Sequence, residues 1–245
     1  MPALLRNLIA RAPAMADLDA VTALVMACDA ADYGLSDDRG EEVHSDWQRL
    51  GFNLKTDAWI IVTTSGQFVG YACVWHSEHA RIQMFACVHP AYRGRGIGTL
   101  LLRLAEARAR EQAEQAPPGV RITLDTAVSN VNAAARHLLE WEGYTLARHF
   151  WRLVIKMDEV PSKTFEEFYQ HGKLKVDLVV DAQNLMGATQ LHQRTGMYVA
   201  RQYDIYEKVL HVGQELPAPP VDRDLSLDSA TVGRDLSPDS AGATV

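Results

Sequence analysis

The chain has 245 residues and a formal net charge of −7, with 47% hydrophobic and 22% charged residues. This composition is ordinary for a globular protein and sufficient for one or two packed domains. The negative charge and the lack of long Lys/Arg runs argue against binding to nucleic acid or to a membrane surface, and no apolar run reaches the ~18 residues of a membrane span. We therefore expect a cytoplasmic protein whose partner is a small molecule or a peptide.

Cysteine usage points to the same kind of protein. Cys28, Cys73 and Cys87 are odd in number, widely spaced and embedded in apolar segments. This pattern favours buried thiols in a reducing compartment over a disulfide framework or a zinc site. We therefore predict no metal.

Hydrophobic periodicity predicts a mixed order of strands and helices over the first 157 residues. The Ser65-Gly66 pair is typical of a hairpin turn, and Gly143 is typical of a residue that ends a helix. The predicted elements are a strand at 5–12, helices at 17–34 and 41–50, strands at 58–64, 67–76 and 80–88, a helix at 97–113, a strand at 120–128, a helix at 131–142 and a strand at 144–157.

A second block of predicted elements is similar in sequence to the end of the first block. A constant shift along the sequence places Ala135 on Ala188 and Gly143 on Gly196, which indicates a duplicated strand-helix-strand unit. Its predicted elements are helices at 164–171 and 184–195 and strands at 174–181 and 197–209. We expect a complete domain at 1–157, a partial repeat at 158–212 and a disordered, Pro/Asp/Ser-rich tail at 213–245.

A glycine- and arginine-rich segment lies between the strand at 80–88 and the helix at 97–113. It reads Arg93-Gly94-Arg95-Gly96-Ile97-Gly98. Main-chain N–H groups at a helix N-terminus bind phosphate, glycines permit close approach, and arginines add positive charge. The segment therefore predicts a site for a diphosphate.

Two nucleotide-binding motifs fit this segment poorly. A dinucleotide site reads G-x-G-x-x-G early in a βαβ unit, whereas here the third glycine comes one residue sooner and a β-meander precedes it. A P-loop requires Gly-Lys-Ser/Thr after the glycines, which this segment lacks. An ordinary turn with surface arginines remains an alternative.

The order of elements and the string Arg93-x-x-Gly96-x-Gly98 resemble the family of GCN5-related N-acetyltransferases (GNAT) over residues 5–157. The segment 129–144, SNVNAAARHLLEWEGY, is similar to the family's next motif. The resemblance implies an α/β (α+β) fold with a mixed, mostly antiparallel sheet flanked by helices, and acetyl-CoA as cosubstrate. The cofactor-binding residues that it implies are Cys87, Val88, Arg93, Gly94, Arg95, Gly96, Ile97, Gly98, Thr99 and Asn132.

The second block resembles the end of another copy of the same domain, as in tandem acetyltransferases that include mycothiol-synthase-like proteins. The cofactor turn of that copy is missing. A strand-helix-strand unit cannot bury its apolar surfaces alone, so we expect residues 164–210 to pack on the first domain or to form a homodimer. A dispensable remnant of a longer tandem enzyme is the alternative.

The resemblance implies transfer of an acetyl group to a primary amine by direct attack in a ternary complex. A general base must lie beside the strand at 80–88, and the candidates are Glu78, His76 and Asp125, or a chain of waters. The family has a Tyr where this chain has Leu139, so the proton donor is Tyr144, Tyr92 or solvent. The competing function is an acyl-CoA-binding protein without turnover.

Overall fold

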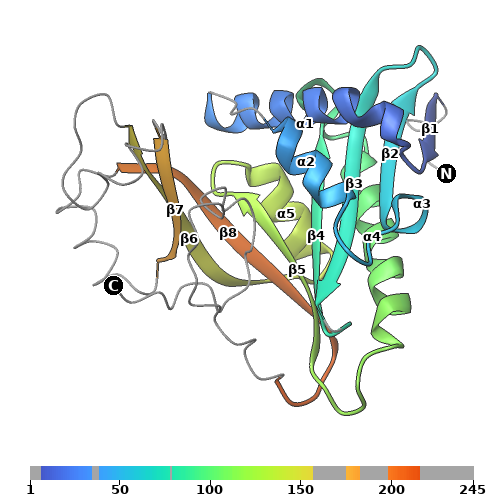
Figure 1. Ribbon diagram of the computed structural model, residues 1–245, viewed down its shortest axis with the longest axis vertical. Coiled ribbons are helices and arrows are strands. Elements are labelled where there is room, and N and C mark those ends of the chain that lie inside the picture. The colour runs from blue at the N-terminus through green and yellow to red at the C-terminus, as the bar shows by residue number, and fades with distance from the viewer. Residues whose placement is uncertain (1–6, 35–38, 78, 157–174, 183–197, 216–245) are drawn as a thin grey trace. The chain divides into compact units, whose positions relative to one another are not determined.

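The computed structural model describes residues 7–34, 39–77, 79–156, 175–182 and 198–215 (Figure 1). The chain divides into two compact units. The first consists of Met1–Leu146 and Tyr206–Leu216, and the second of Ala147–Ile205 and Pro217–Val245. Within the described ranges, no helix has the length and apolar character that crossing a membrane requires.

The first unit is a sheet with helices on both faces. Its strands run in the order β1-β2-β3-β4-β5, with the end of β8 beside β5. Strands β1 to β4 are antiparallel neighbours, and β4 pairs with β5 in parallel. The elements are β1 (Leu8–Arg11), α1 (Leu18–Tyr33), α2 (Gly40–Trp47), α3 (Leu54–Asp57), β2 (Ala58–Thr63), β3 (Phe68–Ser77), β4 (Arg81–Val88), α4 (Ile97–Ala113), β5 (Ile122–Ser129) and α5 (Ala133–Trp141).

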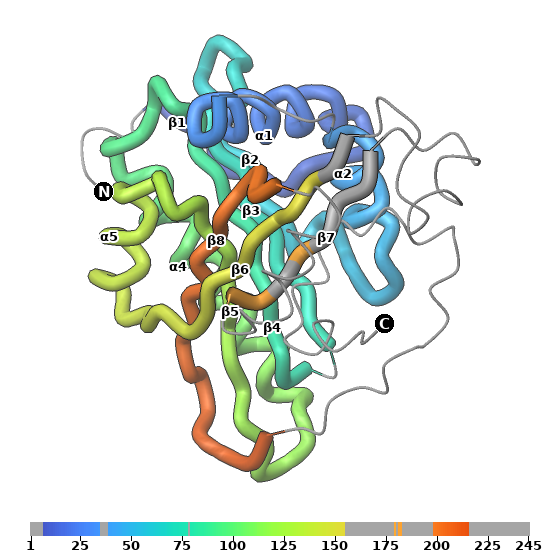
Figure 2. Tube along the Cα trace, turned by 90° about the vertical axis from the view of Figure 1, so that its left-hand side faces the viewer, coloured from blue at the N-terminus to red at the C-terminus, as the bar shows by residue number. Residues whose placement is uncertain are grey.

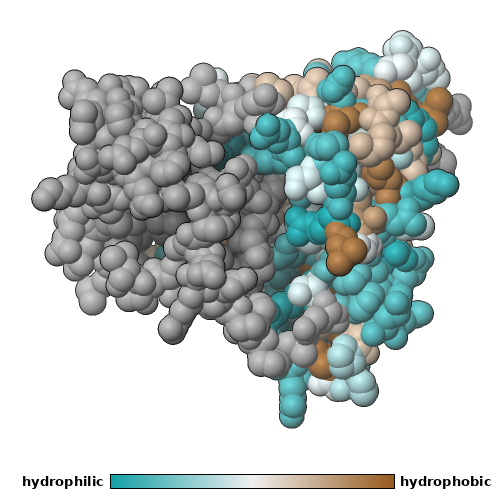
Figure 3. All heavy atoms as spheres, viewed as in Figure 1, coloured by the Kyte–Doolittle hydropathy of each residue, from teal (hydrophilic) through white to brown (hydrophobic). Residues whose placement is uncertain are grey.

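Helices α1 and α2 cover one face of this sheet. The buried positions of α1 recur at helical spacing, as the periodicity predicted, and they pack on inward-facing residues of β2 and β3. From α2, Val43 and Trp47 complete this core. Hydrophilic residues cover much of the outer surface on this side, with hydrophobic ones scattered among them (Figure 3).

Helices α4 and α5 cover the opposite face, as Figure 2 shows. The first turn of α4 packs directly on β3, because Gly70 has no side chain there. A Cβ on Gly70 would lie 2.8 Å from Cγ2 of Ile97 and 3.1 Å from Cδ1 of Leu101. This close contact fixes the N-terminus of α4 next to the end of β4.

The second unit contains most of β6 (Thr145–Lys156), β7 (Lys175–Asp181) and the first part of β8 (Tyr198–His211). The strand order is β8-β6-β7, and β6 and β7 are antiparallel from Phe150–Asp181 to Lys156–Lys175. A hydrogen bond of 2.7 Å joins His149 to Asp204.

The structure confirms the predicted fold class and adds one helix. Helix α3 was not predicted, because its four residues are too few for a periodic pattern; Asn53 caps it by accepting a hydrogen bond from the amide of Lys55 (3.0 Å). The two units also run across the predicted boundary at 157/158, since Tyr206–Leu216 belongs to the first unit. The helices predicted at 164–171 and 184–195, and the tail from 216, lie outside the described residues.

Candidate functional site

Strands β4 and β5 separate before they end, which leaves an opening in the middle of the sheet. Their register runs from Arg81–Thr123 to Met84–Thr126, although β4 continues to Val88 and β5 to Ser129. Ala86 is exposed even though β4 lies between two neighbours. An extended chain therefore has room to lie against the free edge of β4.

The main-chain groups that face this opening follow from the alternation of a strand. The amide of Thr123 donates to the carbonyl of Ala80 (3.1 Å), and the amide of His89 donates to the carbonyl of Val69 on β3 (3.0 Å). Even-numbered residues of β4 therefore turn their main chain toward β5. It follows that the amides of Ala86 and Val88 point into the opening, beyond the last paired residue.

The direction of the main chain distinguishes the two predicted residues, Val88 and Cys87, and adds Ala86 to the candidate site. Val88 faces the opening, and its carbonyl accepts from Sγ of Cys28 (3.3 Å) and Nε of Arg93 (3.4 Å). Cys87 has an odd number, so by the same alternation its main chain faces β3, where its register partner is Tyr71. Ala86 was missed by the sequence analysis, since only its small size distinguishes it from its neighbours.

The turn between β4 and α4 presents main-chain donors to open space. Gly94 and Gly96 adopt left-handed conformations, with φ of +74° and +83°, and a Cβ at either position would meet no atom within 4 Å. The first N–H groups of a helix have no intrahelical acceptor, and α4 begins immediately after Gly96. Exposed donors at the positive end of a helix are a site for a phosphate group.

The residues after Gly96 hold the turn in place. Ile97 is 1% exposed and packs on the sheet. A Cβ on Gly98 would lie 3.1 Å from Cδ2 of Leu138, so this glycine allows α4 and α5 to approach each other. Thr99 is half-buried in the first turn of α4. Contacts of these three residues with a cofactor remain a prediction.

The two arginines of the turn differ in their surroundings. Arg95 is exposed, donates to the carbonyl of Ala91 (3.1 Å) and lies 4.8 Å from the ring centre of Tyr92. Arg93 donates from Nη1 to Oδ1 of Asp32 at 2.8 Å. Both guanidinium groups therefore have contacts near the turn, and that of Arg93 is held by a carboxylate.

Asp32 connects the two sides of the opening. Its Oδ1 binds Arg93, and its Oδ2 accepts from Nδ2 of Asn132 at 3.0 Å. Asn132 also caps α5, because its Oδ1 accepts from the amide of Ala135 (3.1 Å). One carboxylate on α1 thus orients a residue of the turn and a residue at the start of α5.

Asp32 was not predicted, but the sequence holds a signal for it. It lies in the last turn of α1, where the helix dipole disfavours a negative charge. A cation from elsewhere in the fold offsets this effect, and here it is Arg93.

Asp125 lies where the paired part of β4 and β5 ends. It is the register partner of Gln83, whose Oε1 accepts from Nε1 of Trp75 (2.7 Å). Trp75 packs with the α1–α2 core, so the carboxyl group of Asp125 is on that side of the sheet. Burial, and next the negative charge of Glu207, raise the pKa of Asp125 to about 7. Its Oδ1 has no hydrogen-bond partner among the described residues.

The other predicted acid–base residues lie away from the opening or outside the described residues. His76 is opposite Ile82 in the paired part of the sheet, and Ile82 belongs to the core on the α4 side, which is the face opposite Asp125. Tyr144 is buried beside Glu106, ~14 Å from the start of α4, and burial raises the pKa of its hydroxyl. Glu78 is not among the described residues.

Tyr92 and Leu139, which bear on the identity of the proton donor, both have defined contacts. The hydroxyl of Tyr92 donates to Oε1 of Gln67 at 2.8 Å, toward the turn between β2 and β3. Leu139 is 6% exposed and belongs to the core between α5 and the sheet. The described residues therefore place Asp125 at the opening without bringing a predicted Tyr beside it.

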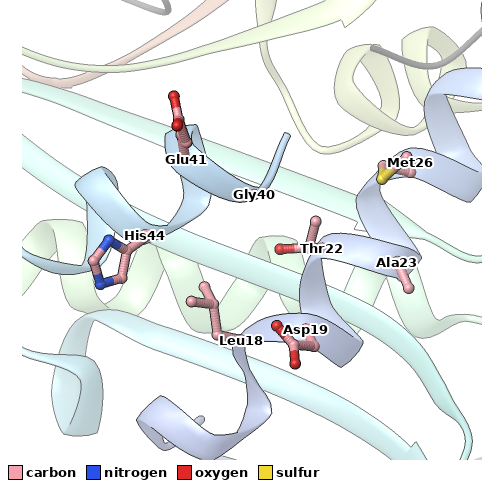
Figure 4. Close-up of a pocket in the computed structure, with 8 residues that line it drawn as sticks. All are labelled: Leu18, Asp19, Thr22, Ala23, Met26, Gly40, Glu41 and His44. Atoms are coloured by element: carbon pink, nitrogen blue, oxygen red, sulfur yellow. The ribbon is translucent and has the colours of Figure 1, made fainter. Parts of the chain in front are cut away.

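A pocket on the outer side of the first unit lies between α1 and α2 (Figure 4). Glu41 and His44 of α2 and Asp19 and Thr22 of α1 are among the residues that line it. The other acids of α2 form ion pairs, Glu42 with Arg39 (3.1 Å) and Asp46 with Arg49 (3.0 Å). The acidic charge of α2 is therefore partly neutralised by arginines that flank the helix.

Known structures share this fold. A GCN5-related N-acetyltransferase from Sphaerobacter thermophilus is 22% identical, with a TM-score of 0.79 and 88% of this chain and 99% of that chain covered. A candidate acetyltransferase from Salmonella typhimurium, solved with its cofactor acetyl-CoA, is 17% identical, with a TM-score of 0.50 over 88% and 99%. A candidate acetyltransferase from Pyrococcus horikoshii is 11% identical, with a TM-score of 0.60 over 85% and 92%.

No curated protein matches the chain. The family model of the GNAT acetyltransferases matches residues 18–144, which contain α1, the opening between β4 and β5, the glycine turn and α5. This match covers more than half of the sequence, and the features described above lie within it. The chain therefore belongs to the acetyltransferase (GNAT) family.

Proposed function

We propose that the chain transfers the acetyl group of acetyl-CoA to a primary amine of a small molecule or a peptide, by direct attack in a ternary complex. The observation that carries this proposal is the opening between β4 and β5, which leads from the exposed glycine turn to Asp125. The known structure that was solved with acetyl-CoA supports the choice of cosubstrate.

The residues present fit acetyl-CoA. The amides after Gly94 and Gly96, with Arg93 and Arg95, suit its diphosphate, because open space and positive charge coincide there. The free edge of β4 suits its amide-containing arm. Acetyl-CoA supplies an activated thioester, and the amides of Ala86 and Val88 are placed to orient the arm that carries it.

Asp125 is the base in this proposal. An amine must lose a proton as it is acylated, and a carboxylate with a pKa near 7 is matched to that task at neutral pH. Its Oδ1 is buried and has no hydrogen-bond partner among the described residues, and in this proposal it accepts a hydrogen bond from the amine through one intervening water. His76 and Tyr144 lie away from the opening and have no role in this proposal, and Glu78, which is outside the described residues, stays a prediction.

No side chain is assigned as the acid. A free thiol has a pKa of about 8–9, so a thiolate leaves without a strong donor and takes its proton from solvent. Leu139 also favours a second candidate function, an acyl-CoA-binding protein without turnover. Incubation with acetyl-CoA and a panel of primary amines separates the two, since thiol release above the amine-free rate requires turnover.

A matched pair of glycine substitutions tests the cofactor site. Gly96 and Gly51 have the same φ of +83°, and a Cβ at either would meet no atom within 4 Å. Gly96→Asp adds a negative charge at the diphosphate site, and Gly51→Asp adds the same charge and the same strain away from it. Titration calorimetry should show acetyl-CoA binding to the Gly51→Asp protein and none to Gly96→Asp. Equal affinities would contradict the proposal.

We also propose that residues 158–212 derive from a second copy of the domain, because their sequence is similar to the end of the first domain. Strands β7 and β8 agree with the two strands predicted for that block. A homodimer through residues 164–210 is part of the same proposal, and its test is given in the Discussion.

A further inference from the structure

Two thiols meet at the end of β4, beside the opening. Cys28 of α1 is 5% exposed, and its Sγ donates to the carbonyl of Val88 (3.3 Å). Its thiol also forms a hydrogen bond with Cys87, which is partly exposed on β4. Both residues belong to the core between α1 and the sheet. Cys28 and Cys87 therefore lie on the same side of the sheet, and Sγ of Cys28 is 3.3 Å from the carbonyl oxygen of the residue that follows Cys87.

The surroundings lower the pKa of the Cys28 thiol. The hydrogen bond with Cys87 has the largest effect, and the positive charge of Arg93 lowers the pKa further, against the opposing effects of burial and of the negative charge of Asp32. A thiolate is the form that attacks an oxidised sulfur. Cys87, the more accessible of the two, is the residue that a small oxidant reaches first.

We propose that Cys28 and Cys87 form a reversible disulfide that weakens acetyl-CoA binding. This inference rests on the proposed function of the opening. A peroxide oxidises the thiol of Cys87 to a sulfenic acid and is itself reduced to water or an alcohol. The thiolate of Cys28 then attacks the sulfur of Cys87, the S–S bond forms, and hydroxide leaves. A dithiol reductant reverses the reaction.

The position of Cys87 explains the effect on binding. It lies between Ala86 and Val88, whose amides face the opening. A disulfide requires the two sulfur atoms to approach to about 2.05 Å, which draws the end of β4 toward α1. The bond also removes the thiol hydrogen that Cys28 donates to Val88. The amides of Ala86 and Val88 then lose the positions that the cofactor arm requires.

The test compares reduced and oxidised full-length protein. The wild-type protein, Cys28→Ser, Cys87→Ala and the matched control Cys73→Ser are each treated with hydrogen peroxide, cleared of oxidant, and analysed by peptide mass spectrometry and by calorimetry with acetyl-CoA. Cys73 is a buried thiol of β3. Circular dichroism verifies the fold of each variant.

We expect the wild-type protein and Cys73→Ser to show a peptide that joins Cys28 to Cys87, with an acetyl-CoA affinity at least tenfold below that of their own reduced forms. In Cys28→Ser and Cys87→Ala, affinity before and after peroxide should agree. Absence of the joined peptide overturns the proposal, and so does a joined peptide with unchanged affinity. Because mass spectrometry detects the disulfide without cofactor, failure of the reduced protein to bind acetyl-CoA would count against the proposed function alone.

Discussion

The charge of Asp125 controls the reaction in our account, so the rate should depend on pH. Burial and Glu207 place the pKa of this carboxyl at about 7, and only its ionised form accepts a proton. The value of kcat/KM should therefore rise with pH through about 7. Asp125→Asn should reduce kcat by ~100-fold or more, the usual effect of losing a general base, and leave the Kd of acetyl-CoA unchanged. Initial rates over the pH range and calorimetry measure both quantities.

Glu207→Gln provides the control for this assignment. Removing the negative charge should lower the pKa of Asp125 and shift the rising limb of the pH–rate profile to more acid values. A profile that is the same in Glu207→Gln and the wild-type protein, with an active Asp125→Asn variant, would rule out Asp125 as the base.

Asp32 should affect cofactor binding although it is not expected to touch the cofactor. It holds Arg93 and Asn132 on opposite sides of the opening. Asp32→Asn keeps a hydrogen-bonding side chain but loses the charge that orients Arg93, and hydrogen bonds to charged groups contribute about 1.5–3 kcal/mol. We expect the KM for acetyl-CoA to rise by ~10-fold with kcat nearly unchanged.

Asp32→Glu should recover part of the lost affinity for acetyl-CoA, since it restores the negative charge on a side chain that is one methylene longer. If Asp32→Asn instead bound acetyl-CoA more tightly, Asp32 would be a competitor of the diphosphate for Arg93 rather than a residue that positions it.

Among the elements, the short helix α3 is fixed to α4 by a buried ion pair. The side chain of Asp57 is 3% exposed, and its carboxylate accepts from Nε of Arg108 at 2.7 Å and from the amide of Asn53 at 2.8 Å. Asp57→Ala leaves the amide of Asn53 without its acceptor and Arg108 with Glu111 alone, which should lower the free energy of unfolding by ~2 kcal/mol. Urea denaturation measures the change.

The matched control is the exposed pair of Arg103 and Glu142, at 2.9 Å with the arginine side chain 65% exposed. Arg103→Ala should cost less than ~1 kcal/mol, because solvent screens such a pair. Similar losses in both variants would show that the pair of Asp57 with Arg108 is not a structural anchor.

Elements with a strong local pattern could be predicted from the sequence, and sites built from distant residues could not. A few neighbouring residues are enough to predict the apolar face of α1, the hairpin of β2 and β3, and the turn at Gly96. Asp32 and Ala86 acquire their roles only when α1, β4 and α5 are brought together. The pKa of Asp125 likewise depends on Glu207, which no local pattern connects to it.

At the scale of the whole molecule, the end of β8 contributes to the core of the first unit. Tyr206 is 1% exposed and its hydroxyl donates to Oε1 of Glu140 (2.8 Å), while Nζ of Lys208 pairs with Glu106 (2.7 Å). A chain that ends at residue 157 lacks both, so we expect its free energy of unfolding to fall by ~3 kcal/mol or more. Thermal and urea unfolding of the truncated protein measure this.

A chain that lacks only residues 217–245 is the control. This segment is rich in Pro, Asp and Ser and repeats itself, so its removal should leave the melting temperature nearly unchanged. Light scattering of the full chain and of both truncated forms tests the homodimer. A monomeric full chain would refute dimerisation through residues 164–210, and equal stability of all three forms would contradict the role of Tyr206.

The central claim is that acetyl-CoA lies in the opening between β4 and β5, and one calorimetric comparison tests it most directly. Ala86 is exposed in the opening, and Ala107 is exposed on the outer side of α4, so a Trp at either position should leave the fold intact. We predict that Ala107→Trp binds acetyl-CoA with wild-type affinity and that Ala86→Trp does not bind it. Undiminished binding by Ala86→Trp would show that the cofactor lies elsewhere.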